Sequence, residues 1–170
     1  MYKRILVPLD GSATSIKGLD EAIRLASLTG ARLRLIHVVD ELLVVTGFET
    51  YPTYVNEVVP LLKQQGERIL EDAKARALAG GATVETKLLE CLGHRASEII
   101  LDEARAWNAD LVVLGTHGRR GFRRLFLGSD AEQISRSSTV PVLLVRAPEQ
   151  TQNSLQLAPV SSSTPVPALV

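Results

Sequence analysis

A glycine-containing segment in the second half of the chain has the residue types that could bind an anion. Gly115-Thr116-His117-Gly118 follows an apolar run, and nine residues later the segment closes with Gly128-Ser129-Asp130-Ala131. Glycines let the main chain approach an anion without Cβ atoms in the way, and the hydroxyls of Thr116 and Ser129 can donate hydrogen bonds. The first amides of a helix are unpaired and carry partial positive charge. The segment therefore predicts a phosphate site, although a glycine-containing turn of this kind can also be purely structural.

Two regular elements must position this segment. The run Asp110–Leu114 is apolar after its first residue, as in strands that are buried on both faces of a parallel sheet. A helix is predicted after Gly128, with Ser129 as its N-cap and Glu132 three residues later completing a capping box. The chain contains neither G-x-x-x-x-G-K-[ST] nor G-x-G-x-x-G, so the two better-known phosphate loops are excluded.

Predicted strands and helices alternate along the chain. The strands are Lys3–Leu9, Leu33–Val39, Thr83–Glu90, Asp110–Leu114 and Val140–Val145, and the helices run from about Ser12 to Gly30, from Pro60 to Gly80, from Ala96 to Ala106 and from Ser129 to about Ser137. This alternation predicts an α/β fold with a parallel sheet and right-handed crossovers. In such folds ligands bind outside the carboxyl ends of the strands, where the strand order reverses.

Several charged residues have local explanations. Asp10 ends the first apolar strand and could cap the first helix, in which Asp20 and Arg24 have the spacing of an ion pair. Arg32 and Arg34 are expected where the second strand meets solvent. His37 and His94 are expected to be structural, and no group of His, Cys and acidic residues has the spacing of metal ligands.

The spacing G-x2-G-x9-G-S after the fourth strand resembles the nucleotide-binding branch of the universal stress protein family. The stretch Ile5-Leu6-Val7-Pro8-Leu9-Asp10-Gly11-Ser12 resembles the first strand of that family and its acidic end. The resemblance covers residues 1–147. It implies one Rossmann-like domain whose open five-stranded parallel sheet, with helices on both faces, has the order 3-2-1-4-5. Asp10 and the Gly115 segment would then face each other between the first and fourth strands.

The resemblance also implies the ligand and its contacts. The ligand would be ATP, AMP or ADP, with any Mg²⁺ held mainly by the phosphates and water. The implied nucleotide-binding residues are Pro8, Leu9, Asp10 and Val38 at the adenosine end, and Leu114, Gly115, Thr116, His117, Gly118, Arg119, Gly128, Ser129, Asp130 and Ala131 in and around the phosphate segment. Taken alone, Val38 reads as a core residue, His117 as solvent-exposed, and the arginine-rich run from Arg119 to Arg124 as a solvated loop. Asp130 replaces the small apolar residue usual in the family, and its charge would repel a phosphate.

This pattern predicts a sensor or regulator that hydrolyses its nucleotide slowly or not at all, because no general base or metal-binding carboxylate is evidently placed. Two alternatives stay open. One is a nucleotide-free dimeric module that binds protein partners. The other is an enzyme of the adenine-nucleotide class, such as an adenylyl transferase, although the chain shows no recognised signature for that transfer.

Composition and the chain ends limit partners and location. Lysine plus arginine and aspartate plus glutamate both number 19, so no overall field favours nucleic acid or membranes. The only cysteine, Cys91, suits a reducing compartment, and no apolar run reaches the length of a membrane span. We therefore expect a cytoplasmic protein.

The apolar last strand predicts a symmetric homodimer through Val140 to Arg146. Residues 148–170 are expected to form a disordered tail.

Overall fold

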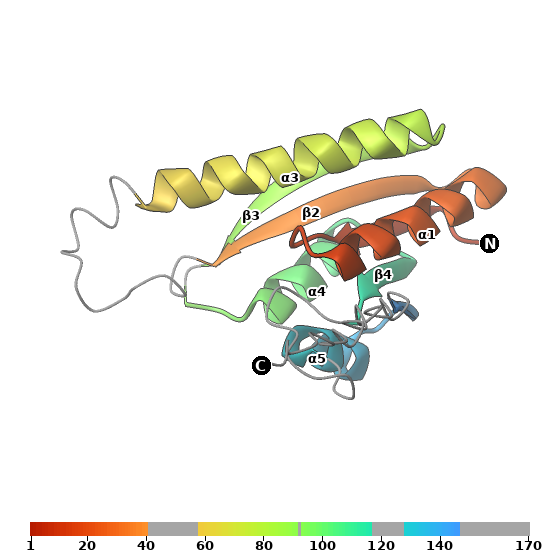
Figure 1. The fold of residues 1–170 in the computed structure, drawn as a ribbon. Coiled ribbons are helices and arrows are strands. Elements are labelled where there is room, and N and C mark those ends of the chain that lie inside the picture. Colours follow the sequence, from red (N-terminus) through yellow and green to blue (C-terminus); the bar gives the residue numbers. More distant parts are fainter. Residues whose placement is uncertain (41–57, 92, 117–127, 147–170) are drawn as a thin grey trace, which may run out of the picture.

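The computed structural model describes residues 1–40, 58–91, 93–116 and 128–146 (Figure 1). The predicted tail and the arginine-rich run from Arg119 to Arg124 lie outside these ranges. Within the described ranges, no helix is both long and apolar enough to cross a membrane.

The strands pair in parallel and form one sheet. They are β1 (Arg4–Pro8), β2 (Arg32–Asp40), β3 (Thr83–Cys91), β4 (Leu111–Gly115) and β5 (Val142–Val145). Their order is β3-β2-β1-β4-β5, which confirms the predicted topology. Successive side chains of β1 point to opposite faces of the sheet, so Ile5 and Val7 join one apolar layer and Leu6 joins the other. Both layers exclude water from β1, which lies at the centre of the sheet.

Helices cover both faces of the sheet, as Figure 1 shows. They are α1 (Ala13–Thr29), α3 (Val59–Ala79), α4 (Ala96–Ala106) and α5 (Ser129–Ser137). The first two pack on the face that buries Leu33 and Leu35, and the other two on the face that buries Ile36 and Val112. The helix ends follow local chemistry: α1 ends at Gly30, which adopts the left-handed φ of 69° that glycine tolerates.

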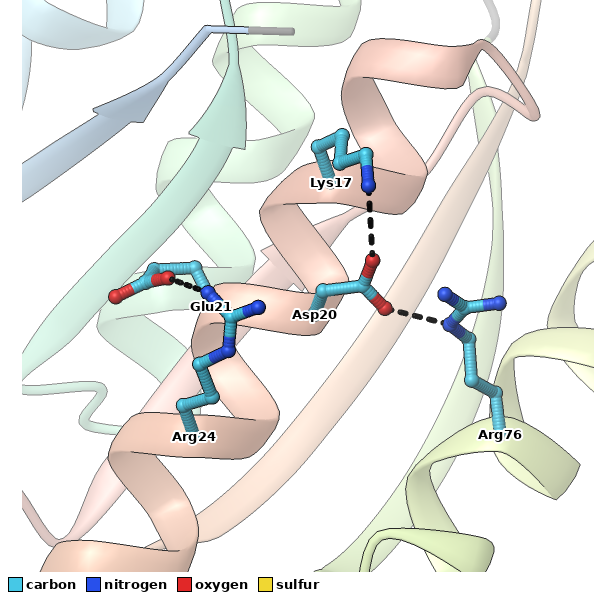
Figure 2. Close-up of polar contacts among 5 residues, drawn as sticks. All are labelled: Lys17, Asp20, Glu21, Arg24 and Arg76. Atoms are coloured by element: carbon cyan, nitrogen blue, oxygen red, sulfur yellow. Dashed lines mark hydrogen bonds and ion pairs between the residues drawn. The ribbon is translucent and has the colours of Figure 1, made fainter. Parts of the chain in front are cut away.

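An ion pair joins the two helices of the first layer. Arg76 of α3 donates from Nε to Oδ1 of Asp20 on α1 at 2.5 Å, and Lys17 lies 3.9 Å from the other carboxylate oxygen (Figure 2). The hydrogen bond to Asp20 raises the pKa of Arg76. The predicted pairing of Asp20 with Arg24 is wrong, because Arg24 bonds Glu21 at 3.0 Å instead. Asp20 faces the neighbouring helix, where a guanidinium is available.

The second layer contains a buried ionic cluster that the sequence did not reveal. Glu103 of α4 is 5% exposed and accepts from Arg34 of β2 and from Lys87 of β3, each at 2.6 Å. Arg34 also lies 3.1 Å from Glu85, and its guanidinium stacks 4.6 Å from the centre of the Trp107 ring. The prediction that Arg34 lies in solvent is therefore wrong. Parallel pairing and the α4 crossover bring its charge partners from two other elements, so the charge is buried with compensation.

Candidate functional site

The strand order reverses between β1 and β4, which defines the switch point of the sheet. Ile5 of β1 is paired both with Leu33 of β2 and with Leu111 of β4. The chain leaves β1 through α1 on one face, whereas it leaves β4 towards α5 on the other. The carboxyl ends of these two strands therefore diverge, and the loops after Pro8 and Gly115 flank the position where such sheets bind ligands.

The turn after β1 is held by its own side chains. Asp10 is half-buried and accepts a hydrogen bond from the Ser12 amide through Oδ1 at 3.0 Å. Ser12 is the N-cap of α1, since its hydroxyl accepts from the Ser15 amide at 3.2 Å. The alternative in which Asp10 caps this helix is therefore wrong. Gly11, with a φ of 80°, supplies the left-handed residue between them, so the Asp10 carboxylate lies in a defined turn before the helix.

Gly115 touches the backbone of the first turn of α1. A Cβ atom on Gly115 would lie 2.6 Å from the carbonyl carbon of Thr14, 2.7 Å from its oxygen and 2.9 Å from the Ser15 nitrogen. Neither backbone can yield without moving a whole element. Gly18, one turn further along α1, comes less close, with a Cβ position 3.4 Å from the Gly115 nitrogen. Glycine at position 115 thus has a structural reason of its own, the close packing of α1 on β4.

Thr116 closes the segment that follows β4. It is buried, donates its amide to the Val145 carbonyl at 3.0 Å and accepts from the Gly128 amide at 2.9 Å. The second bond brings the two halves of the predicted phosphate segment together. His117, Gly118 and Arg119 lie between them, outside the described residues.

The start of α5 differs from the prediction by one residue. Gly128, not Ser129, is the N-cap, and no side chain caps the helix there. The Glu132 amide donates to the Gly128 carbonyl at 2.8 Å, so Glu132 is the fourth helical residue and is one position too far along for a capping box. Its carboxylate pairs with Arg136 at 2.8 Å instead. Ser129 lies exposed in the first turn, and its hydroxyl does not cap the helix.

Charge in that first turn is acidic. Asp130 and Glu132 both lie there, and the Asp130 side chain is exposed. Carboxylates stabilise the positive end of a helix dipole, but they also compete with a bound phosphate for it. Ala131 faces inward and is buried against the second layer.

The remaining predicted site residues have buried or half-buried side chains. Leu9 and Leu114 are buried in opposite layers, while Pro8 and Val38 are half-buried. A ligand at the switch point would meet the main chain of Leu9 and Leu114, not their side chains. The described residues also form a hollow of about 270 Å³, but it lies between the end of α4 and the loop before β5.

The two described histidines have different environments. His37 is buried and its Nδ1 lies 2.7 Å from the Leu9 carbonyl oxygen, whereas His94 is exposed and lies 3.6 Å from Glu98. Across the part of the chain that the structure describes, no group of three His, Cys, Asp or Glu residues could hold a metal ion.

The open parallel sheet, its order and its covered faces define a Rossmann-like α/β protein. Residues 1–146 match the model of the universal stress protein family. Universal stress protein YxiE of Bacillus subtilis is 38% identical over 151 residues, which cover 86% of this chain and 100% of the relative. The chain belongs to the universal stress protein family.

Solved structures agree with this assignment. A universal stress protein family member from Burkholderia pseudomallei matches with a TM-score of 0.70 and 34% identity, covering 86% of this chain and 97% of that one. A universal stress protein solved in complex with cAMP matches with a TM-score of 0.60 and 25% identity, covering 85% of this chain and 97% of that one.

Replacing Gly115 tests the structural reason for this glycine. We expect Gly115→Ala to lower the free energy of unfolding by about 1 to 3 kcal/mol, because the new methyl group overpacks rigid backbone. Gly18→Ala is the matched control and should be neutral or stabilising, since alanine favours a helix by up to about 1 kcal/mol over glycine. Urea denaturation measures both, and equal effects at the two positions would contradict the close packing of α1 on β4.

Proposed function

We propose that this universal stress protein binds an adenine nucleotide at the switch point between β1 and β4. The supporting geometry is the hydrogen bond from the Gly128 amide to the Thr116 carbonyl, which sets the start of α5 beside the end of β4. The first turn of α1, after Asp10, lies against the same strand end at Gly115. A helix start, a strand end and a carboxylate therefore converge. A family structure solved with cAMP supports an adenine nucleotide as the ligand.

The two strand ends would bind different parts of the nucleotide. The turn after β1 takes the adenosine, with Asp10 accepting from a ribose hydroxyl and the Val38 main chain at the base. The amides at the start of α5 and the Ser129 hydroxyl take the phosphates, because these donors lie at the positive end of the helix. The residues of this assignment are Pro8, Leu9, Asp10, Val38, Leu114, Gly115, Thr116, Gly128, Ser129, Asp130 and Ala131, with His117, Gly118 and Arg119 of the connecting segment.

Regulation rather than rapid turnover is the role we propose. The described residues hold no metal cluster, so Mg²⁺ would arrive with the phosphates of its nucleotide. Binding and release of a nucleotide would then change the state of the protein, and the nucleotide itself would not be consumed. The cytoplasm, where adenine nucleotides occur and thiols such as Cys91 stay reduced, is the compartment that fits this role.

Titration calorimetry with ATP, AMP and cAMP, with and without Mg²⁺, tests this proposal. Asp10→Asn keeps the oxygen that accepts from Ser12 but removes the charge, so the turn should survive. We expect affinity to fall by about tenfold or more, because hydrogen bonds to a charged group contribute about 1.5 kcal/mol or more.

Asp20→Asn, further along α1, is the matched control and should bind as the wild type does. Absence of heat and of any thermal shift at millimolar nucleotide would contradict the proposed function. That result would favour a nucleotide-free interaction module.

Asp130 should set the preference among nucleotides. We expect Asp130→Asn to raise the affinity for ATP by about two- to fivefold, since a charge near a helix terminus contributes about 0.3 to 1 kcal/mol. The affinity for AMP should rise less, because AMP carries fewer negative charges. Asp102→Asn on α4 removes an exposed carboxylate elsewhere and serves as control. No gain for either nucleotide would place the phosphates away from α5.

We also propose that two copies associate through β5. In the described residues this edge strand pairs only with β4, and the side chains of Val142, Leu143, Leu144 and Val145 are all half-buried. An apolar strand edge of this kind favours pairing with another strand. A two-fold axis would let β5 of each copy meet its counterpart.

Sedimentation equilibrium measures this association. We expect Leu143→Glu to shift the protein to monomers at concentrations where the wild type is dimeric, because the charge would be buried in the interface. Thr86→Glu on β3, at the opposite edge, should leave the assembly unchanged. A wild type that sediments as a monomer at high concentration would refute the association.

A further inference from the structure

His37 lies where the ladder between β1 and β2 ends. The last paired residues are Pro8 and Ile36, so His37 and Leu9 are the next residues of their strands. The His37 ring points to the α3 side of the sheet and is 8% exposed. Its Nδ1 lies 2.7 Å from the Leu9 carbonyl oxygen. A side chain therefore continues the hydrogen bonding one residue beyond the strand.

This contact fixes both the tautomer of His37 and the main chain of Leu9. A carbonyl oxygen only accepts, so Nδ1 must carry the hydrogen. The Leu9 amide donates to the Ile36 carbonyl at 2.8 Å. Leu9 is thus held at its amide by Ile36 and at its carbonyl by His37. The next residue is Asp10, whose carboxylate accepts a hydrogen bond from the Ser12 amide.

Gly66 gives the imidazole its space. It lies inside α3, where glycine is unfavourable relative to alanine. A Cβ atom at this position would lie 2.6 Å from Cδ2 of His37 and 2.7 Å from Cδ1 of Leu88. The Leu88 methyl group can turn away, but the imidazole is held by its hydrogen bond. A residue that weakens the helix is therefore explained by the ring below it.

We infer that His37 is a positioning residue of the switch-point site, which acts through the Leu9 carbonyl to hold the Asp10 turn in place. Gly66 is the partner that admits its ring. The inference rests on the proposed nucleotide site for its functional consequence, but the mechanical link from His37 to the turn can be measured without any ligand. Loss of the link would leave the fold intact and loosen the carboxylate that faces the ribose.

Two substitutions separate the hydrogen bond from the bulk of the ring. His37→Asn can still donate from its amide to Leu9, whereas His37→Leu fills the space with no donor. Amide hydrogen exchange, read by NMR, should show the Ser12 amide exchanging faster in His37→Leu and at nearly the wild-type rate in His37→Asn. Nitrogen-15 spectra of the wild-type imidazoles should show His37 protonated at Nδ1. Unchanged Ser12 exchange in His37→Leu, or a His37 ring protonated only at Nε2, would overturn the inference.

Nucleotide titration gives the functional arm. With AMP as the probe, we expect His37→Leu to bind about fivefold more weakly, equivalent to one lost hydrogen bond, and His37→Asn to stay near the wild type. His94→Asn, at the exposed histidine, is the control. Equal affinities for the wild type and a folded His37→Leu would overturn the positioning role. If wild-type protein binds no nucleotide, the proposed function fails, while the Ser12 exchange still decides whether His37 holds the turn.

A double-mutant cycle tests the partnership with Gly66. Gly66→Ala should lower the Tm strongly in the wild type, because the methyl group meets the fixed ring. In the His37→Asn background, which lacks the Cδ2 atom, the same substitution should cost less. Equal Tm losses in both backgrounds would show that the His37 ring is not the reason for glycine at position 66 and would remove that part of the inference.

Discussion

The contact between Gly115 and the first turn of α1 is the constraint on which the proposed site depends. Because no side chain separates the two backbones, α1 sits directly on the end of β4. The Asp10 turn, which precedes this helix, is thereby placed beside the strand end that leads to Thr116 and α5. Two loops that are about a hundred residues apart in sequence share one location because a glycine lets a helix and a strand touch. Binding residues can then be added to either loop without a new scaffold.

Two polar side chains inside the layers are buried with partners from other elements. Glu103 joins α4 to β2 and β3 through Arg34 and Lys87, and His37 joins β2 to the end of β1. Removing one partner destabilises the fold by more than the intact pair stabilises it, because a buried charge or carbonyl is left unpaired. These side chains therefore specify how the elements align rather than how stable the fold is. The cluster around Glu103 aligns α4 with β2 and β3, while His37 lies at the switch point.

Local patterns predicted the elements well, and long-range neighbours explain where they failed. The helix from Ala96 to Ala106 and the stop at Gly30 follow from periodicity and from one left-handed residue, both of which are local. The N-cap of α5 was misplaced because Gly128 and Ser129 both suit a cap, and the strand-end bond to Thr116 selects Gly128. Arg34 and Asp20 were assigned by spacing along one element, yet their partners lie on others. For the candidate site, the glycine pattern and the family resemblance singled out the two loops that flank the switch point, but the contacts of Gly115, Ser12 and His37 depend on the three-dimensional structure.

The bond between Thr116 and Gly128 joins the end of β4 directly to the start of α5. It is one backbone hydrogen bond of 2.9 Å, and Thr116 is also tied to β5. Closing a loop costs little more when the loop is longer, so residues can be inserted or exchanged between these ends without displacing β4 or α5. The number and identity of the residues between Thr116 and Gly128 can thus change while the sheet stays the same, and a designer could graft a loop of another sequence between the same two residues.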